Sequence, residues 1–300
     1  PNPRIPHRVL VPSQQLGTAV DGQIVMVELT QQPSRTSGPV GRVARILGDH
    51  GAPGMETEIA IHSHSLPCEF PAAVAAEADG FGTRIPQDAI AGREDLRHLE
   101  LVTIDGEDAR DFDDAVWCER RSGGWRVIVA IADVAHYVRP GNPLDVEARE
   151  RGTSVYFPNR VLPMLPEALS NGLCSLKPDE DRLCLCCELR VGEDGRITRS
   201  RFFEGVMRSV ARLTYRDVGE FLEKPAAKHA PGLERLRERL LALHGAYKSF
   251  IRARSGRGAL ELDTPELKLK FDEQGKVAAL VEYPRNDAHR LIEECMIAAN

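Results

Sequence analysis

Short apolar runs separated by clusters of glycine, proline and serine occupy the first 80 residues of the chain. Runs of this length, bounded by residues that favour turns, are typical of β-strands joined by tight connections. The pattern predicts strands at residues 9–11, 23–29, 41–47 and 58–61. Their spacing favours a small barrel or sandwich, so we predict an all-β domain over residues 1–80.

The pattern changes between residues 70 and 95, where weak helical character replaces the strands, and we assign residues 81–95 to a connector. Beyond it, apolar runs predict strands at residues 99–104 and 125–132. The second run is almost entirely apolar, which is typical of a strand buried on both faces. Residues 182–189 alternate between apolar and polar side chains and predict another strand.

Apolar side chains at intervals of three and four residues predict a long helix after Pro231 and Gly232 that ends near Gly256. They are Leu233, Leu236, Leu240, Leu243, Tyr247 and Phe250. A further helix is predicted after the segment 283–287. Because strands and helices both follow the connector, we predict a mixed α/β domain over residues 96–300.

Composition narrows the class of protein. Hydrophobic residues make up 42% of the 300 residues and charged residues 28%, values ordinary for a globular chain. The net charge of −6 gives no global signal for nucleic acid but leaves room for a local basic channel. No apolar run approaches the length of a membrane-spanning helix, so we expect no membrane partner. Seven unpatterned cysteines indicate reduced thiols and a cytoplasmic location.

The two ends of the sequence do not have the pattern of natural termini. The chain opens without Met and closes at Asn300 inside an amphipathic pattern, with no Gly or Pro stop signal after it. We therefore expect this sequence to be a piece of a longer protein.

The chemistry is concentrated in residues 105–114, which contain six acids and one base, Arg110. The acids are Asp105, Glu107, Asp108, Asp111, Asp113 and Asp114. An apolar strand leads into this segment and residues 115–118 lead out, so it lies at the end of a core strand. Two carboxylates about 4 Å apart repel by about 4 kcal/mol at an effective dielectric of about 20. Converging carboxylates therefore favour binding of a Mg²⁺ or Mn²⁺ ion. Such an ion can activate water and stabilise the charge that develops in an in-line phosphoryl displacement.

Other interpretations of the acidic segment fit less well. A merely solvated loop is disfavoured by the flanking apolar strands. An EF-hand starting at Asp105 would need Gly where Arg110 stands and Glu where Val116 stands. An aspartyl-phosphate site has the spacing of Asp111 and Asp113, but Ala109 and Arg110 precede them instead of an apolar strand. Zinc would require His or Cys nearby.

Ordered motifs along nearly the whole chain resemble the catalytic domain of the ribonuclease II family. They are residues 103–115, 131–138, 151–158, 163–166, 169–176 and 285–294. The resemblance implies a processive, hydrolytic 3′→5′ exoribonuclease that depends on Mg²⁺, with Mn²⁺ as a substitute, and releases nucleoside 5′-monophosphates. It also implies that Asp105, Asp111 and Asp114 are metal ligands and that Asp113 is the acid most directly tied to cleavage.

The resemblance also implies RNA contacts. An aromatic ring in a loop or edge strand offers a face for base stacking, and the family places such a Tyr, here Tyr156, near the 3′-terminal nucleotide. Phe157 is expected in the core. Asn171, Arg285, Asn286 and Glu293 stand in matching segments and are predicted to contact RNA.

Residues 1–80 resemble the OB-type cold-shock domain that precedes this catalytic domain in the family, and Arg35, Arg42 and Arg45 would guide RNA there; a spacer domain is the alternative. The family's catalytic domain continues past the equivalent of Asn300, so we expect a truncated domain and assume neither a complete active site nor activity of this fragment alone. We expect a monomer. The competing hypotheses are an RNA-binding protein with a degenerate catalytic domain, against which the four aspartates argue, and a phosphatase acting on small phosphoesters.

Overall fold

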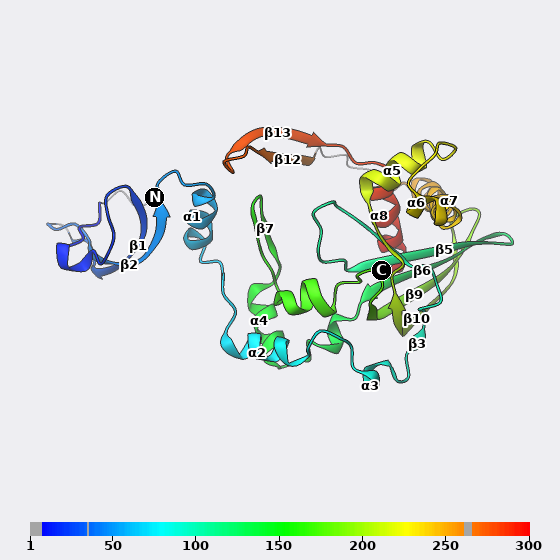
Figure 1. Ribbon diagram of the computed structural model, residues 1–300, viewed down its shortest axis with the longest axis horizontal. Coiled ribbons are helices and arrows are strands. Elements are labelled where there is room, and N and C mark those ends of the chain that lie inside the picture. Colours follow the sequence, from blue (N-terminus) through cyan, green and yellow to red (C-terminus); the bar gives the residue numbers. More distant parts are fainter. Residues whose placement is uncertain (1–7, 35, 261–265) are drawn as a thin grey trace. The chain divides into compact units, whose positions relative to one another are not determined.

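Residues 8–34, 36–260 and 266–300 are described by the computed structural model, in which the chain divides into two units (Figure 1). The smaller unit contains the described residues up to Glu69, together with Val155–Leu162 and Leu267–Glu282. The larger unit contains Phe70–Ser154, Tyr283–Asn300 and the described residues between Pro163 and Glu266. Both units are therefore built from segments that are distant in the sequence.

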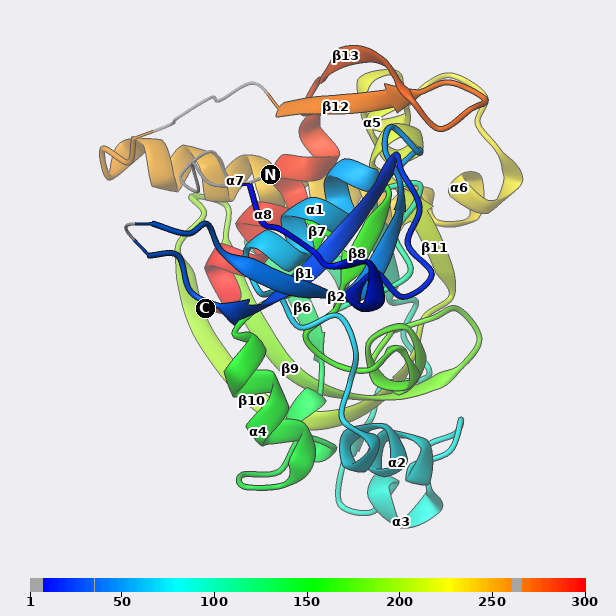
Figure 2. The ribbon, with the colours of Figure 1, turned by 90° about the vertical axis from the view of Figure 1, so that its left-hand side faces the viewer.

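The smaller unit is organised around the antiparallel pair β1 (Gln23–Gln31) and β2 (Val40–Asp49), seen in Figure 2. These strands confirm the predictions for residues 23–29 and 41–47. The unit also contains the 3₁₀ turn η1 and helix α1, the hairpin β7–β8 and the hairpin β12–β13. Their bounds are Ser13–Gln15, Met55–Ser63, Val155–Phe157, Arg160–Leu162, Glu266–Phe271 and Val277–Tyr283.

Two strand predictions in the smaller unit are wrong. Residues 58–61 lie inside helix α1, because a short apolar run does not distinguish a strand from a helix turn. Glu56 and Glu58 occupy the first turn of α1, where carboxylates favour a helix. Residues 9–11 form a single bridge, from Leu10 to Val40, and the following Pro12 has no N–H with which to extend a ladder.

The larger unit is built on a seven-stranded sheet in the order β11-β4-β5-β6-β9-β10-β3. The pairs β11–β4 and β10–β3 are parallel, and the other pairs are antiparallel. The strands in chain order are Glu94–Asp95, Val102–Asp105, Asp114–Arg121, Gly124–Ala132, Asp181–Gly192, Ile197–Arg208 and Ala211–Thr214. The predicted strands at 125–132 and 182–189 are confirmed, and the one at 99–104 begins only at Val102.

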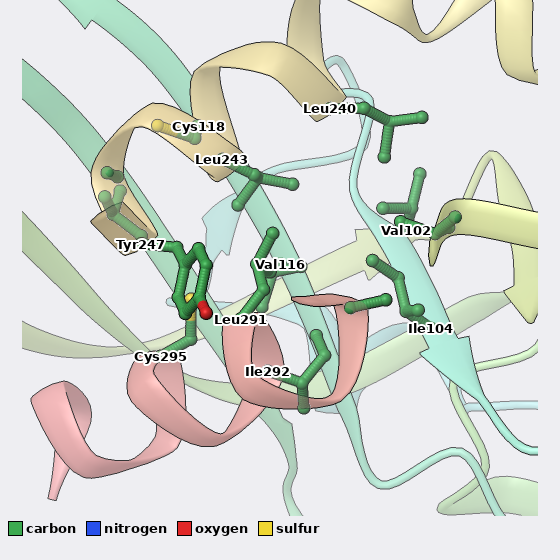
Figure 3. Packing of buried hydrophobic residues seen from close by; sticks show 14 of the residues in the cluster. Val102, Ile104, Val116, Cys118, Leu240, Leu243, Tyr247, Leu291, Ile292 and Cys295 are labelled. Atoms are coloured by element: carbon green, nitrogen blue, oxygen red, sulfur yellow. The ribbon is translucent and has the colours of Figure 1, made fainter. Parts of the chain in front are cut away.

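Helices cover both faces of this sheet. One face carries α5 (Tyr215–Glu223), α6 (Pro231–Arg235), α7 (Arg237–Gly256) and α8 (Asp287–Ala299). Figure 3 shows side chains of α7 and α8 packed on those of β4 and β5. The other core contains residues of α2 (Ala72–Gly80), α4 (Pro143–Arg151) and the π-helical turn η3 (Ala168–Leu173). The short α3 (Gln87–Ile90) and η2 (Val134–His136) complete the unit.

Strand β6 supplies both cores, as its apolar sequence predicts. Trp125, Val127 and Val129 pack with α5–α8, whereas Ile128 and Ala130 pack in the second core. The predicted long helix is also confirmed, although Leu236 divides it into α6 and α7. The weak helical character expected between residues 70 and 95 corresponds to α2 and α3, of which only α3 lies within the segment 81–95.

All seven cysteines are free thiols, as predicted, and six of them are buried. Three of the buried thiols, Cys184, Cys186 and Cys187, lie on β9. Among the residues that the structure describes, no helix has the length and apolar character needed to cross a membrane.

Candidate active site

The acidic segment is the loop that connects two neighbouring strands of the sheet. Strand β4 ends at Asp105, and β5, its antiparallel neighbour, begins at Asp114. Asp105 lies opposite Thr214 of β11, and Asp114 lies opposite Ile131 of β6. Because the chain returns along the adjacent strand, the two carboxylates are brought to the same edge of the sheet with the intervening loop above them.

Two side chains from distant segments hold the loop. The guanidinium of Arg212 on β11 donates to the carbonyl oxygen of Gly106, at 2.9 Å, and to that of Glu107. Fully buried Ser175 donates from Oγ to the carbonyl oxygen of Arg110, at 2.8 Å, and accepts from the backbone N–H of Phe112, at 3.1 Å. These bonds fix the backbone on both sides of Asp111. Sequence reasoning missed both residues.

The four predicted aspartates influence one another electrostatically. Burial raises the pKa of Asp114 to about 7, with further contributions from Asp105 and Asp113. Burial also raises the pKa of Asp105, opposed by the N–H of Gly106 and reinforced by Asp111. The pKa of Asp113 is raised by burial and then by Asp111 and Asp105, although its side chain is exposed at the surface of the loop. Each carboxylate thus makes its neighbours harder to ionise.

The chemistry of this cluster fits a divalent cation. Oδ2 of Asp114 is buried and has no hydrogen-bond partner among the residues that the structure describes, which is costly for a carboxylate unless a cation binds it. The potential ligands are all oxygen atoms, which Mg²⁺ and Mn²⁺ prefer. Within the described ranges, however, no three His, Cys, Asp or Glu side chains already stand in a metal-holding arrangement. The assignment of Asp105, Asp111 and Asp114 as ligands therefore stays a prediction.

The raised pKa of Asp114 predicts a pH-dependent stability in EDTA. The folded-state pKa of about 7 exceeds the ordinary value of 3.8, so the folded protein retains a proton that the unfolded chain releases. The free energy of unfolding should therefore fall as pH rises from about 4 to 7, by about 4 kcal/mol at most. Asp114→Asn should lack this contribution. Urea unfolding at several pH values checks it, and parallel pH profiles for the two proteins would refute it.

Asn171 lies close to the outer side of the acidic loop. It projects from η3 into a cleft of about 830 Å³ that Asp108, Arg110 and Arg212 also line. This places it in the same unit as the four aspartates. Its predicted contact with RNA is untested.

Tyr156 belongs to the smaller unit, on strand β7, and its side chain is 66% exposed. Most of its surface is thus exposed to solvent. Phe157 does not lie in a core, contrary to expectation: it is half-buried and lines a cleft of about 670 Å³. It follows the exposed Tyr156 in a three-residue strand of a two-stranded hairpin, which offers little surface for burial.

Asn286, Arg285 and Glu293 have structural partners at helix α8. Asn286 caps the helix by accepting from the N–H groups of Ala288 and His289, and its Nδ2 donates to the carbonyl oxygen of Tyr215, at 2.8 Å. Arg285 forms an ion pair with Glu293. The bond from Asn286 to Tyr215 links the start of α8 to the start of α5, and RNA contacts of Arg285, Asn286 and Glu293 remain a prediction.

Glycine at position 219 permits this docking. A Cβ atom there would overlap Nδ2 of Asn286, so any side chain would displace the cap.

Tyr215 is a further residue of the site that sequence reasoning missed. It begins α5 directly after β11, and burial together with Asp105 and Asp114 raises the pKa of its phenol. Its ring stacks on His289 with centroids 4.0 Å apart. The parallel pairing of β11 with β4 places Tyr215 near Asp105, and no local feature of the sequence predicts that pairing.

Comparison with known proteins assigns the family. A model of the RNB domain matches residues 93–300, and a model of the cold shock domain matches residues 1–71. The chain therefore belongs to the RNB-domain family. The predicted architecture, an OB-type cold-shock domain followed by a mixed α/β ribonuclease II-type domain, is confirmed.

Within this family the motifs also predict similarity to bacterial ribonuclease R, which is confirmed. Ribonuclease R of Vibrio parahaemolyticus and that of Escherichia coli are each 50% identical over 99% of this chain, which spans 36% of either relative's length. The structure of Mycoplasma genitalium RNase R in complex with ribose-methylated single-stranded RNA is 27% identical, with a TM-score of 0.91. It covers 100% of this chain, which spans 46% of that one.

Proposed function

We propose that the protein is a hydrolytic 3′→5′ exoribonuclease that degrades RNA processively to nucleoside 5′-monophosphates. The observation that carries this proposal is the position of the acidic segment between the end of β4 at Asp105 and the start of β5 at Asp114, where its carboxylates raise one another's pKa. The similarity to proteins named ribonuclease R supports it. In this proposal residues 1–80 bind RNA, residues 81–95 connect, and residues 96–300 form the N-terminal part of the catalytic domain.

Asp105, Asp111 and Asp114 would hold Mg²⁺, or Mn²⁺ in its place. The ion, when bound, supplies an activated water and neutralises charge that develops on the phosphoryl oxygens. Asp113 is exposed on the loop, and its carboxylate would orient the attacking water and accept its proton. Arg212 and Ser175 hold the loop so that the carboxylates keep their positions.

The remaining roles concern the RNA strand. Tyr156 would stack on a base near the 3′ end, a contact worth about 1–3 kcal/mol per base. Asn171, Arg285, Asn286 and Glu293 would contact the strand. Arg42 and Arg45 are more than half exposed and would guide RNA across the cold-shock domain, whereas Arg35 lies outside the described residues.

The proposal extends to the state and place of the protein. Seven free thiols support a reducing compartment, which we take to be the cytoplasm. We also propose a monomer, which sedimentation of the intact protein would test.

The test is a cleavage assay with the intact protein and 5′-labelled single-stranded RNA. In Mg²⁺ we expect direct conversion to a very short labelled remnant without long intermediates, and in EDTA we expect intact RNA. RNA that is bound but never shortened would favour the RNA-binding protein with a degenerate domain. Turnover of a small chromogenic phosphoester without RNA degradation would favour the phosphatase.

A further inference from the structure

Three arginines stand side by side across the sheet of the larger unit. Arg126 on β6 lies directly opposite Arg190 on β9, which lies directly opposite Arg199 on β10. Directly opposed residues share one face of a sheet, and like charges in such positions destabilise the pairing. We call these three residues the arginine row. Its like charges are unfavourable for the sheet wherever no counter-charge lies beside them.

The row opens into a cleft of about 380 Å³ whose lining is completed by Glu188 and Arg201. Glu188 is the carboxylate within the cleft. It accepts two hydrogen bonds from Arg126, at 2.9 and 3.0 Å, and one from Arg201, at 3.1 Å, and it lies 3.6 Å from Arg190. One carboxylate is thus shared among three guanidinium groups, so the cleft keeps an excess of positive charge.

The carboxylates around the cleft do not neutralise the charge of every arginine in the row. Glu119 reaches Arg126, and Glu94 reaches Arg201. The side chain of Arg199 has no ion pair or hydrogen bond among the residues that the structure describes, although Arg190 lies directly opposite it. Its guanidinium is therefore free to bind an anion without breaking an existing interaction.

We propose that the arginine row binds successive phosphates of an RNA strand whose 3′ end is held elsewhere. Guanidinium groups bind phosphate oxygens in a bidentate manner. The row crosses two strand spacings, about 10 Å in all, which exceeds the reach of one phosphate and fits a polymer better than a free phosphate. The described residues that line the cleft are four arginines and Glu188, so it would hold the RNA backbone without reading bases. RNA as the ligand rests on the proposed function.

The row is separate from the candidate active site. Asp114 lies opposite Ile131, five residues along β6 from Arg126, which is about 17 Å. The register of β5 and β6, two strands labelled in Figure 1, places Arg126 opposite Glu119 near the turn that joins them, whereas Asp114 lies at the other end of β5. Arg126 also shares the face of Ile128 and Ala130, opposite to that of Val116 and, by alternation, Asp114. An RNA strand must therefore be long to reach both the acidic loop and the arginine row.

Binding of fluorescent RNA to the intact protein in EDTA tests the proposal. Arg199→Ala should weaken binding of a 30-nucleotide strand roughly three- to tenfold. The slope of log affinity against log salt should flatten by about 0.7 for each phosphate that the variant no longer binds. Binding of a 6-nucleotide strand should be unchanged. Arg190→Ala combined with Arg199→Ala should enlarge both effects.

Arg196→Ala is the matched control, because Arg196 is 84% exposed, lies between β9 and β10 and is outside the row. The proposal is overturned by unchanged affinity and slope in the row variants, by an equal decrease in the control, or by a decrease that accompanies a lowered melting temperature. The cleavage assay separates it from the proposed function. If the row variants bind RNA more weakly but the wild-type protein never cleaves it, the arginine row is supported and the nuclease is refuted. If the wild-type protein cleaves RNA but the row variants bind it as tightly as the wild type, the nuclease is supported and the row is refuted.

Discussion

Asp113→Asn in the intact protein is expected to lower the rate of RNA cleavage at least about a thousandfold while RNA affinity changes less than about twofold. The substitution keeps the volume of the side chain but removes its charge and its capacity to accept a proton. The fold should persist, because the structural contact of this residue is its carbonyl oxygen, which accepts from the N–H of Ala132 at 2.8 Å. Single-turnover cleavage of labelled RNA and gel-shift binding measure the two quantities.

Asp108→Asn is the matched control for this experiment. Asp108 lies in the same loop and is also exposed, but it lines the outer cleft and does not contribute to the raised pKa values of Asp105, Asp113 and Asp114. Its replacement should leave turnover within about twofold. Turnover at the wild-type rate by Asp113→Asn would refute the catalytic role proposed for Asp113. An equal decrease in both variants would mean that the charge of the whole loop matters and no single acid does.

The sequence predicts the larger unit well where its elements have strong periodicity. The apolar run at 125–132 forms the central strand β6, and the leucine spacing after Pro231 forms α6 and α7. Both signals reflect burial, which acts on every residue of the element. The run at 58–61 fails because four residues cannot separate a period of 2.0 from one of 3.6. The length of the apolar pattern therefore decides whether the type of element can be predicted from it.

The candidate site divides in the same way. The four aspartates are visible in the sequence because they occupy one short loop. Ser175, Arg212 and Tyr215 are not visible, since they reach that loop only through long-range contacts and through the pairing of β11 with β4. The arginine row is likewise a product of strand register, because its members are far apart in the sequence, from Arg126 to Arg199, and meet only across neighbouring strands.

Phe221→Ala is expected to lower the free energy of unfolding of the larger unit by about 3–5 kcal/mol. Phe221 is fully buried on α5, and its ring lies 4.9 Å from that of His229. Alanine would leave a cavity in the core that joins α5–α8 to the sheet. Urea unfolding followed by tryptophan emission measures the effect in this unit, because the only two tryptophans, Trp117 and Trp125, both lie in its sheet.

Phe202→Ala is the matched control, since the same side chain on β10 is 61% exposed and should contribute less than about 1 kcal/mol. If Phe221→Ala does not fold, Phe221→Leu keeps most of the volume and should show a smaller shift in the same direction. Equal midpoints for Phe221→Ala and Phe202→Ala would show that α5 is not held by this core. The position of Tyr215 beside Asp105 and Asp114 would then need another explanation, because α5 begins at that residue.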